Sequence, residues 1–209
     1  MVANRAKLKL AVLISGRGSN LQALIDACAR ADYPARIALA ISNVAGAGGL
    51  ARAEAAGIPT ATIPHREFET REAFEAEITA ALRRAGVELV CLAGFMRLLT
   101  PGFVEDWRDR LINIHPSLLP DYKGLHVHER VIEAGEDFSG CTVHYVRPDM
   151  DSGPIIKQAK VAVEADDNAD TLAARVLEQE HIIYPEAVRL IAEGRVRIEN
   201  ECVVINAGT

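Results

Sequence analysis

In the first half of this 209-residue chain, short apolar runs alternate with longer segments of helical periodicity, and this alternation constrains the fold most. Apolar, strand-like runs occupy residues 8–14, 37–41, 61–63 and 89–93, and helical patterns occupy residues 19–28, 50–56 and 70–85. Repeated strand–helix–strand units predict crossover connections and a mainly parallel, twisted sheet that is covered by helices on both faces. The uninterrupted apolar run at 89–93 is typical of a central parallel strand.

The pattern changes after residue 100. Residues 111–114 end in a His-Pro step, residues 141–146 alternate like an antiparallel or edge strand, and residues 155–163 follow as a partner. The last helix is expected over residues 169–193, interrupted or bent at Pro185. We therefore predict a single α/β domain over residues 1–209. Its Rossmann-like, phosphate-binding half is residues 1–100, and its catalytic half, with an antiparallel addition to the sheet, is residues 101–209.

Charge and cysteine usage narrow the class of protein. The formal net charge is -6 and no long Lys/Arg cluster occurs, which argues against nucleic acid as a partner. The four cysteines are widely spaced, so a disulfide framework or zinc site is not expected and a cytoplasmic location fits best. The apolar stretch at residues 10–14 is too short for a signal peptide or a membrane span.

A glycine-rich loop at residues 15–21 follows the first strand and opens the first helix, which Ser19 or Asn20 is expected to cap. Backbone N–H groups and the helix dipole favour an anion at such a position. A dinucleotide fingerprint would need a small residue in place of Leu21 and an acidic residue in place of Asn43. The loop therefore favours a phosphate monoester, with a purely structural tight turn as the alternative.

Three residues of the second half form a candidate catalytic set: Asn113, His115 and Asp151. An amide can stabilise a developing oxyanion, an imidazole can move a proton, and a carboxylate can orient and charge the imidazole. This is the equipment for acyl-group transfer without a covalent nucleophile. The structural alternative is that the His-Pro step ends a strand and that Asp151 belongs to an ordinary turn.

Other polar residues allow two interpretations each. His126 and His128 lie close to His115 and His144 in sequence, but a third metal ligand at suitable spacing is lacking, so no metal is predicted. Residues 126–128 fit either a strand or the start of a helix. Glu180 lies within a helix, where it either faces solvent or reaches substrate hydroxyls. Residues 95–99 follow a central strand and either line a slot for a flat ring or close the core.

Taken together, these motifs resemble the phosphoribosylglycinamide formyltransferase family. The resemblance runs in order along residues 8–190 with compatible spacing. It is carried by residues 10–20, 92–97, 112–120, 124–128, 140–154 and 178–181.

The resemblance implies a role for each matching residue. The substrate phosphate and ribonucleotide would be held by Gly18, Ser19, Asn20 and Glu180; the folate by Arg71, Met96, Arg97, Leu98, Leu99 and Asn113; and catalysis would depend on Asn113, His115 and Asp151. Residues 147–150 correspond to a loop whose backbone meets the pterin, although Pro148 and Ser152 depart from the family pattern.

The activity that the resemblance implies belongs to purine synthesis. The formyl group of 10-formyltetrahydrofolate would pass to the amine of phosphoribosylglycinamide through a tetrahedral intermediate, without a metal. The implied partners are these small molecules, with no nucleic acid and no membrane, and the enzyme would be a monomer or homodimer.

Three rival functions use parts of the same sequence. A 10-formyltetrahydrofolate deformylase would use water as the acceptor, but an extra N-terminal domain is expected there and the first strand here begins by residue 8. A tRNA formyltransferase would need a C-terminal RNA-binding domain and a basic surface. A non-catalytic nucleotide-binding module would use only the loop at residues 16–20.

Overall fold

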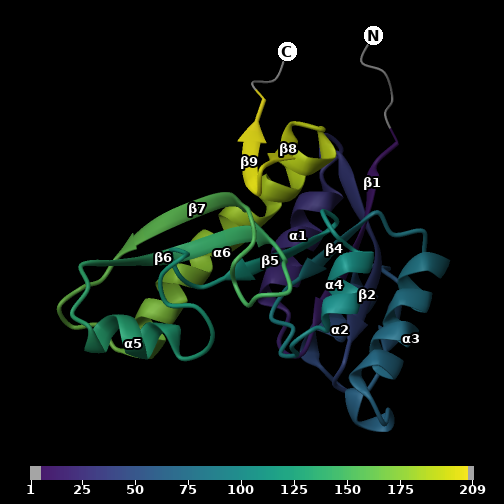
Figure 1. The fold of residues 1–209 in the computed structure, drawn as a ribbon, viewed down its shortest axis with the longest axis horizontal. Helices are drawn as coiled ribbons and strands as arrows, with labels where there is room; N and C mark the ends of the chain where they lie inside the picture. The colour runs from purple at the N-terminus through teal and green to yellow at the C-terminus, as the bar shows by residue number, and fades with distance from the viewer. Residues whose placement is uncertain (1–5, 207–209) are drawn as a thin grey trace.

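The computed structural model describes residues 6–206, and expectations for residues 1–5 and 207–209 lie outside that range. A seven-stranded sheet runs through the molecule in the order β3-β2-β1-β4-β5-β6-β7 (Figure 1). The strands are β1 (Leu8–Ile14), β2 (Ala35–Ser42), β3 (Thr60–Thr62), β4 (Leu89–Leu92), β5 (Leu111–His115), β6 (Phe138–Tyr145) and β7 (Ile155–Ala162). Strands β1 to β5 pair in parallel, whereas β5–β6 and β6–β7 pair antiparallel. The predicted α/β architecture with an antiparallel addition is confirmed.

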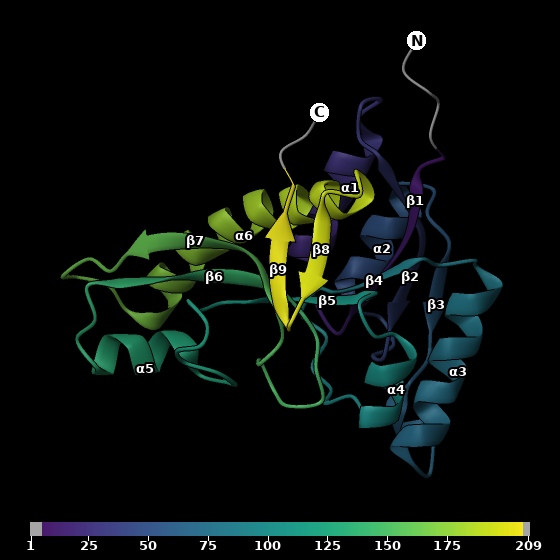
Figure 2. The ribbon, with the colours of Figure 1, turned by 45° about the horizontal axis from the view of Figure 1, so that its top comes forward.

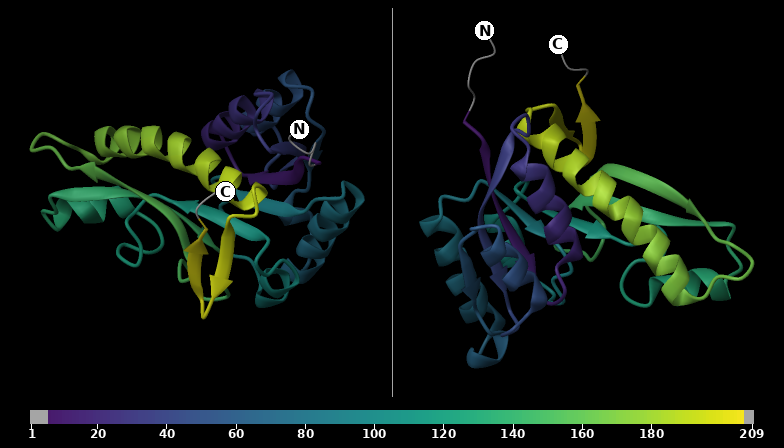
Figure 3. Two further views of the ribbon diagram at one scale, coloured as in Figure 1. Left: turned by 90° about the horizontal axis from the view of Figure 1, so that it is seen from above. Right: turned by 180° about the vertical axis from the view of Figure 1, so that it is seen from behind.

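Helices cover both faces of this sheet (Figures 1 and 3). They are α1 (Ser19–Ala29), α2 (Gly48–Ala55), α3 (Arg71–Arg84), α4 (Pro101–Asp106), α5 (Val127–Glu133) and α6 (Ala169–Ala192), with a short 3-10 turn η1 (His65–Glu67) before α3. Alternate residues of β1 enter different cores. Val12 packs with side chains of α1, α2, α5 and α6, whereas Leu13 packs with those of α3 and α4. This two-sided burial explains why β1 and β4 are almost continuously apolar.

The structure decides several local expectations. Helix α6, expected to be interrupted or bent at Pro185, is not interrupted there and runs through this residue as one helix. Helix α1 is not capped by Ser19 or Asn20, because Gly18 takes the N-cap position with φ 72° and no side chain caps the helix. Of the two alternatives for residues 126–128, a strand and a helix start, the helix start is confirmed, since His126 is the N-cap of α5.

A small antiparallel hairpin, β8 (Val196–Glu199) and β9 (Cys202–Ile205), was not predicted. It follows α6 and forms its own two-stranded sheet (Figure 2). Its tip lies beside the loop that joins β6 to β7. Its strands have only four residues each, which is close to the limit of what an alternating pattern can reveal.

The strand order reverses between β1 and β4, because the chain leaves β1 towards β2 and returns to β4 on the other side of β1. Ligands of open α/β sheets bind at the carboxyl ends of the strands at such a switch point. Here the glycine loop and the segment after β4 leave the sheet side by side, since the backbone N–H of Ser15 donates to the Gly94 carbonyl at 3.1 Å. Both candidate ligand segments therefore begin at the same place. Within residues 6–206 no helix is long and apolar enough to cross a membrane.

Candidate active site

The glycine loop packs its backbone directly against the start of α2. A Cβ atom added to Gly18 would lie 2.5 Å from the Cα of Gly49, and the φ of Gly18 is 72°. Both facts require glycine at position 18, since other residues avoid this conformation and the space is filled by backbone. The Gly49 N–H also donates to the Gly16 carbonyl at 3.0 Å. The loop is therefore held in one shape by backbone contacts.

Asn20 and Glu180, both predicted to contact the ribonucleotide, meet in the structure although 160 residues separate them. The Asn20 amide Nδ2 donates to Oε2 of Glu180 at 2.6 Å, joining α1 to α6. Burial raises the pKa of Glu180, against the opposing effect of this hydrogen bond. The Asn20 Oδ1 atom is buried without a hydrogen-bond partner. A buried polar atom of this kind, next to the glycine loop, suits a ligand that donates a hydrogen bond.

Asn113, His115 and Asp151 converge at the carboxyl end of β5. The His115 Nδ1 atom lies 3.4 Å from Oδ2 of Asp151, and the side chains of both residues are nearly buried. The other ring nitrogen, Nε2, lies 3.0 Å from the carbonyl oxygen of Tyr122, to which it must donate. Asp151 is itself anchored, because its Oδ2 accepts from the Gly124 N–H at 2.9 Å. When both of its nitrogens are protonated, the imidazole has an acceptor facing each N–H group.

His144 completes this group, and its part in it was not predicted. It stands opposite Asn113 in the antiparallel pairing of β5 with β6. Its Nδ1 donates to the Tyr145 carbonyl at 2.9 Å, so its Nε2 can accept from the Asn113 amide Nδ2 at 3.4 Å. Burial lowers the pKa of His144, which favours this neutral state. This contact fixes the orientation of the Asn113 amide, with Nδ2 facing His144. The second N–H of Asn113 Nδ2 is then available to a ligand.

The loop after β5 is anchored by side chains of β6 and β7. The Thr142 hydroxyl donates to the Ser117 carbonyl at 2.6 Å and accepts from the Leu119 N–H at 3.1 Å. Gln158 donates to the same hydroxyl and to the Leu119 carbonyl, both at 2.9 Å. These buried contacts hold the loop that carries the Tyr122 carbonyl to His115.

The predicted folate segment, residues 96–99, is open to solvent where the chain leaves β4, the strand next to β5. Met96 and Leu98 are 67% and 66% exposed, Arg97 is exposed and Leu99 is half-buried. An exposed apolar pair beside a polar cluster suits a flat, partly apolar ligand better than core closure. The segment is tied to the glycine loop, since the Met96 N–H donates to the Ser15 hydroxyl at 2.8 Å. Ser15 in turn donates to Asn43 Oδ1 at 2.5 Å.

Helix α3 supports the same segment from the other side. Phe74 stacks on Phe95 with ring centroids 6.5 Å apart. Buried Glu75 accepts hydrogen bonds from both the backbone N–H and the hydroxyl of Thr100. Arg71 is the first residue of this helix, is exposed, and lies one turn before Phe74. Its contact with folate stays a prediction.

The histidines do not assemble a metal centre in the part of the chain that the structure describes. Within residues 6–206 no group of three or more His, Cys, Asp or Glu side chains could hold a metal ion. His126 instead extends into solvent and pairs with Glu129, its Nδ1 lying 3.6 Å from Oε1.

Sequence and structure comparisons identify the group of proteins to which these features belong. The profile of the family described as "Formyl transferase" matches residues 8–188. A phosphoribosylglycinamide formyltransferase of Escherichia coli (strain K12) is 47% identical over 191 residues, which cover 91% of this chain and 90% of that protein. This chain belongs to the formyl transferase family.

Two further relatives place it within the formyl transferases. The crystal structure of glycinamide ribonucleotide transformylase 1 from Symbiobacterium toebii superimposes with a TM-score of 0.93 at 45% identity, covering 95% of this chain and 94% of that one. The trifunctional purine biosynthetic protein adenosine-3 of Drosophila pseudoobscura pseudoobscura is 52% identical over 201 residues. The match covers 95% of this chain but only 15% of that much longer protein. The range that matches the formyl transferase profile contains every site residue considered above.

Proposed function

We propose that this chain transfers the formyl group of 10-formyltetrahydrofolate to the primary amine of phosphoribosylglycinamide, releasing tetrahydrofolate and the N-formyl product. The observation that carries the proposal is the convergence of Asn113, His115 and Asp151 at the carboxyl end of β5, at the same edge of the sheet as two candidate ligand segments. The segment with the exposed Met96 and Leu98 follows the neighbouring strand β4, and the glycine loop, near Asn20 and Glu180, follows β1 on the other side of β4.

The order of bond changes follows from the groups present. The substrate amine attacks the formyl carbon, and the formyl oxygen gains the negative charge of a tetrahedral intermediate. The second N–H of Asn113 donates to this oxygen, and a protonated His115 adds positive charge beside it. The amine loses a proton as N10 of the folate gains one, the carbon–N10 bond breaks, and tetrahydrofolate leaves. No covalent enzyme intermediate is required.

The two carboxylates have separate tasks in this proposal. Asp151 lies 3.4 Å from Nδ1 of His115 and accepts from the Gly124 N–H, so it orients the imidazole and balances its charge. Glu180 contacts the ribonucleotide together with Asn20, while Gly18 and Ser19 offer N–H groups to the phosphate at the start of α1. Arg71, Arg97 and Leu99 would contact the folate with Met96 and Leu98.

The test is a spectrophotometric formyl-transfer assay with 10-formyltetrahydrofolate, with and without phosphoribosylglycinamide. Turnover that requires the ribonucleotide supports the proposal. Folate release at an equal rate without the ribonucleotide would mean that water is the acceptor and that the enzyme is a deformylase. If neither condition gave turnover, the proposed activity would be wrong.

We also propose where the enzyme works and in what oligomeric state. Its substrates are small molecules, and the acidic net charge of -6 suits neither nucleic acid nor an anionic membrane surface. We propose a cytoplasmic enzyme that is a monomer or homodimer, and sedimentation equilibrium would distinguish these two states.

A further inference from the structure

Arg147 is a buried cation held by two carboxylates from distant parts of the chain. Its side chain is only 8% exposed. Its Nη2 donates to Oδ1 of Asp109 at 2.8 Å, and its Nε donates to Oε2 of Glu201 at 2.6 Å. Asp109 precedes β5, and Glu201 lies at the tip of the β8–β9 hairpin. Although burial opposes it, pairing with Glu201 and Asp109 raises the pKa of Arg147.

Both carboxylates occupy an unfavourable backbone conformation. The φ angles are 58° for Asp109 and 57° for Glu201, in the left-handed region that costs most residues about 1 kcal/mol or more. Glycine is the usual residue at such a position in a two-residue hairpin turn. A glutamate there indicates that its side chain contributes something that glycine could not: an ion pair with buried Arg147 and a second one with Arg108, whose Nη2 lies 2.6 Å from the other carboxylate oxygen of Glu201.

Arg147 also lies at the neck of the loop that joins β6 to β7, which is the place where the two ends of this loop meet. The two sides of the neck are close, since the Tyr145 N–H donates to the Pro154 carbonyl at 2.9 Å. A Cβ atom added to Gly153 would lie 3.2 Å from Cγ of Arg147. The aliphatic part of the Arg147 side chain therefore packs against the end of the loop, and the Arg147 backbone forms the beginning of the same loop.

This loop delivers Asp151 to His115. Asp151 has a φ of 49°, so the loop presents the carboxylate in a conformation that its neighbours must maintain. One restraint is the Gly124 N–H, which binds the carboxylate itself at 2.9 Å. The contacts of Arg147 restrain the base of the loop, 4 positions earlier in the chain.

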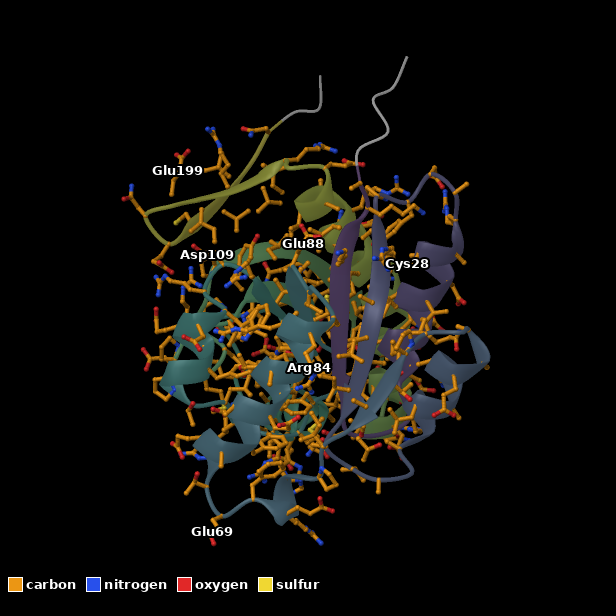
Figure 4. The ribbon with its side chains drawn as sticks, turned by 90° about the vertical axis from the view of Figure 1, so that its right-hand side faces the viewer. Cys28, Glu69, Arg84, Glu88, Asp109 and Glu199 are labelled. Carbon is orange, nitrogen blue, oxygen red and sulfur yellow. The ribbon has the colours of Figure 1, made fainter. Side chains whose placement is uncertain are left out.

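We propose that the β8–β9 hairpin is a positioning device for the catalytic loop: Glu201, with Asp109, clamps Arg147 and thereby holds Asp151 against His115. Figure 4 shows Asp109 beside the hairpin. The ion pair is the only described link between the carboxylate of Glu201 and this loop, and removing it leaves the buried guanidinium with one carboxylate, that of Asp109, and the Val146 carbonyl as partners. Arg147 then gains by moving towards solvent, which loosens the neck. This inference rests on the proposed formyl transfer for its kinetic consequence only.

Two substitutions at Glu201 separate positioning from stability. Glu201→Gln removes the charge, and Glu201→Gly removes the whole side chain while relieving the strained turn. The matched control is Glu199→Gln in the same hairpin, which removes the same charge from an exposed pair with Arg197 at 3.5 Å. Glu199 is labelled on the hairpin in Figure 4. Asp109→Asn tests the second carboxylate, because asparagine tolerates the same backbone conformation.

The first readout is hydrogen exchange of the peptide covering residues 147–153, which needs no catalytic activity. We expect faster exchange there in both Glu201 variants and in Asp109→Asn, and wild-type exchange in Glu199→Gln. The second readout is steady-state kinetics. We expect kcat to fall by about two- to tenfold with an unchanged KM for the ribonucleotide, as for groups that act through another residue. In Glu201→Gly the relief of the strained turn should offset part of the stability that is lost with the ion pair, and the melting temperature measures the balance.

The outcomes are distinguishable. If the Glu201 variants match Glu199→Gln in loop exchange, the clamp is refuted whatever the activity. If loop exchange rises but kcat stays at the wild-type value, the hairpin restrains the loop without positioning Asp151, and the proposal is again overturned. If the wild-type enzyme transfers no formyl group, the proposed function fails, while the exchange comparison still decides the clamp.

Discussion

At the scale of single residues, substitution of Asn113 is the most direct test of the candidate site. Its Nδ2 donates to His144, and its second N–H is assigned to the oxyanion. Loss of one such donor costs about 10²–10³ in turnover, so Asn113→Ala should be nearly inactive in steady-state assays. The lost hydrogen bond to His144 should cost about 1 kcal/mol of stability.

A control with a comparable loss of stability separates catalysis from folding. Asn168 caps α6 and accepts from the N–H groups of Asp170 and Thr171, far along the chain from the catalytic set. Asn168→Ala should also cost about 1 kcal/mol, measured by urea denaturation, but should keep wild-type turnover. Near-wild-type turnover in Asn113→Ala would refute the oxyanion assignment.

Glu180 should make stability depend on pH. Because burial raises its pKa above the ordinary 4.5, its contribution to stability is fully present below that value and is lost as pH rises through the raised pKa. Glu180→Gln should therefore lose less stability than wild type between acidic and neutral pH, measured by urea denaturation at several pH values. Glu178→Gln, an exposed change on the same helix, should follow the wild-type profile. Parallel profiles for both variants would contradict the prediction.

At the scale of secondary-structure elements, the conformation of the glycine loop depends on contact between its backbone and the backbone of α2. Gly18 and Gly46 share a positive φ, 72° and 71°, but only Gly18 faces another backbone atom. Gly46→Ala should cost about 1 kcal/mol for its conformation alone. Gly18→Ala should cost clearly more, because Gly49 must also move, and it should raise the KM for the ribonucleotide. Equal losses in the two variants, measured by chemical denaturation, would show that the contact with α2 is unimportant.

The elements also show what the sequence could predict. The strands that form the sheet are apolar on one or both faces, so their apolar runs were visible without any tertiary information. Helix α4 was missed because it has six residues, too short for a periodicity, although Thr100 and Pro101 form a typical helix start. Asn113, His115 and Asp151 were identified from their chemistry and a family resemblance. The contacts of His144 and Arg147 depend on strand register and on a distant hairpin, which no local pattern encodes.

At the scale of the whole molecule, the two halves of the chain share one sheet and one set of contacts. The Tyr184 hydroxyl of α6 donates to the Leu92 carbonyl of β4 at 2.9 Å, and the Tyr33 hydroxyl donates to the Pro185 carbonyl at 2.7 Å. The candidate site lies where these halves meet, with Asn20 from one and Glu180 from the other. A site built in this way requires both halves to be folded at the same time.

We therefore predict that the chain unfolds as one domain, in a single cooperative transition. Trp107, the only tryptophan, is buried in the cluster that contains Leu13, Phe74 and Ile78, so its fluorescence reports the core on the face of the sheet that α3 and α4 cover. Cys141 is fully buried in β6 of the second half. In a variant that keeps only this cysteine, its reaction with a thiol reagent during rapid pulses reports the core on the other face of the sheet, which α1 and α6 cover. Fluorescence and thiol exposure should share one urea midpoint. Two separate midpoints would refute the single transition, because the cores on the two faces of the sheet would then unfold separately.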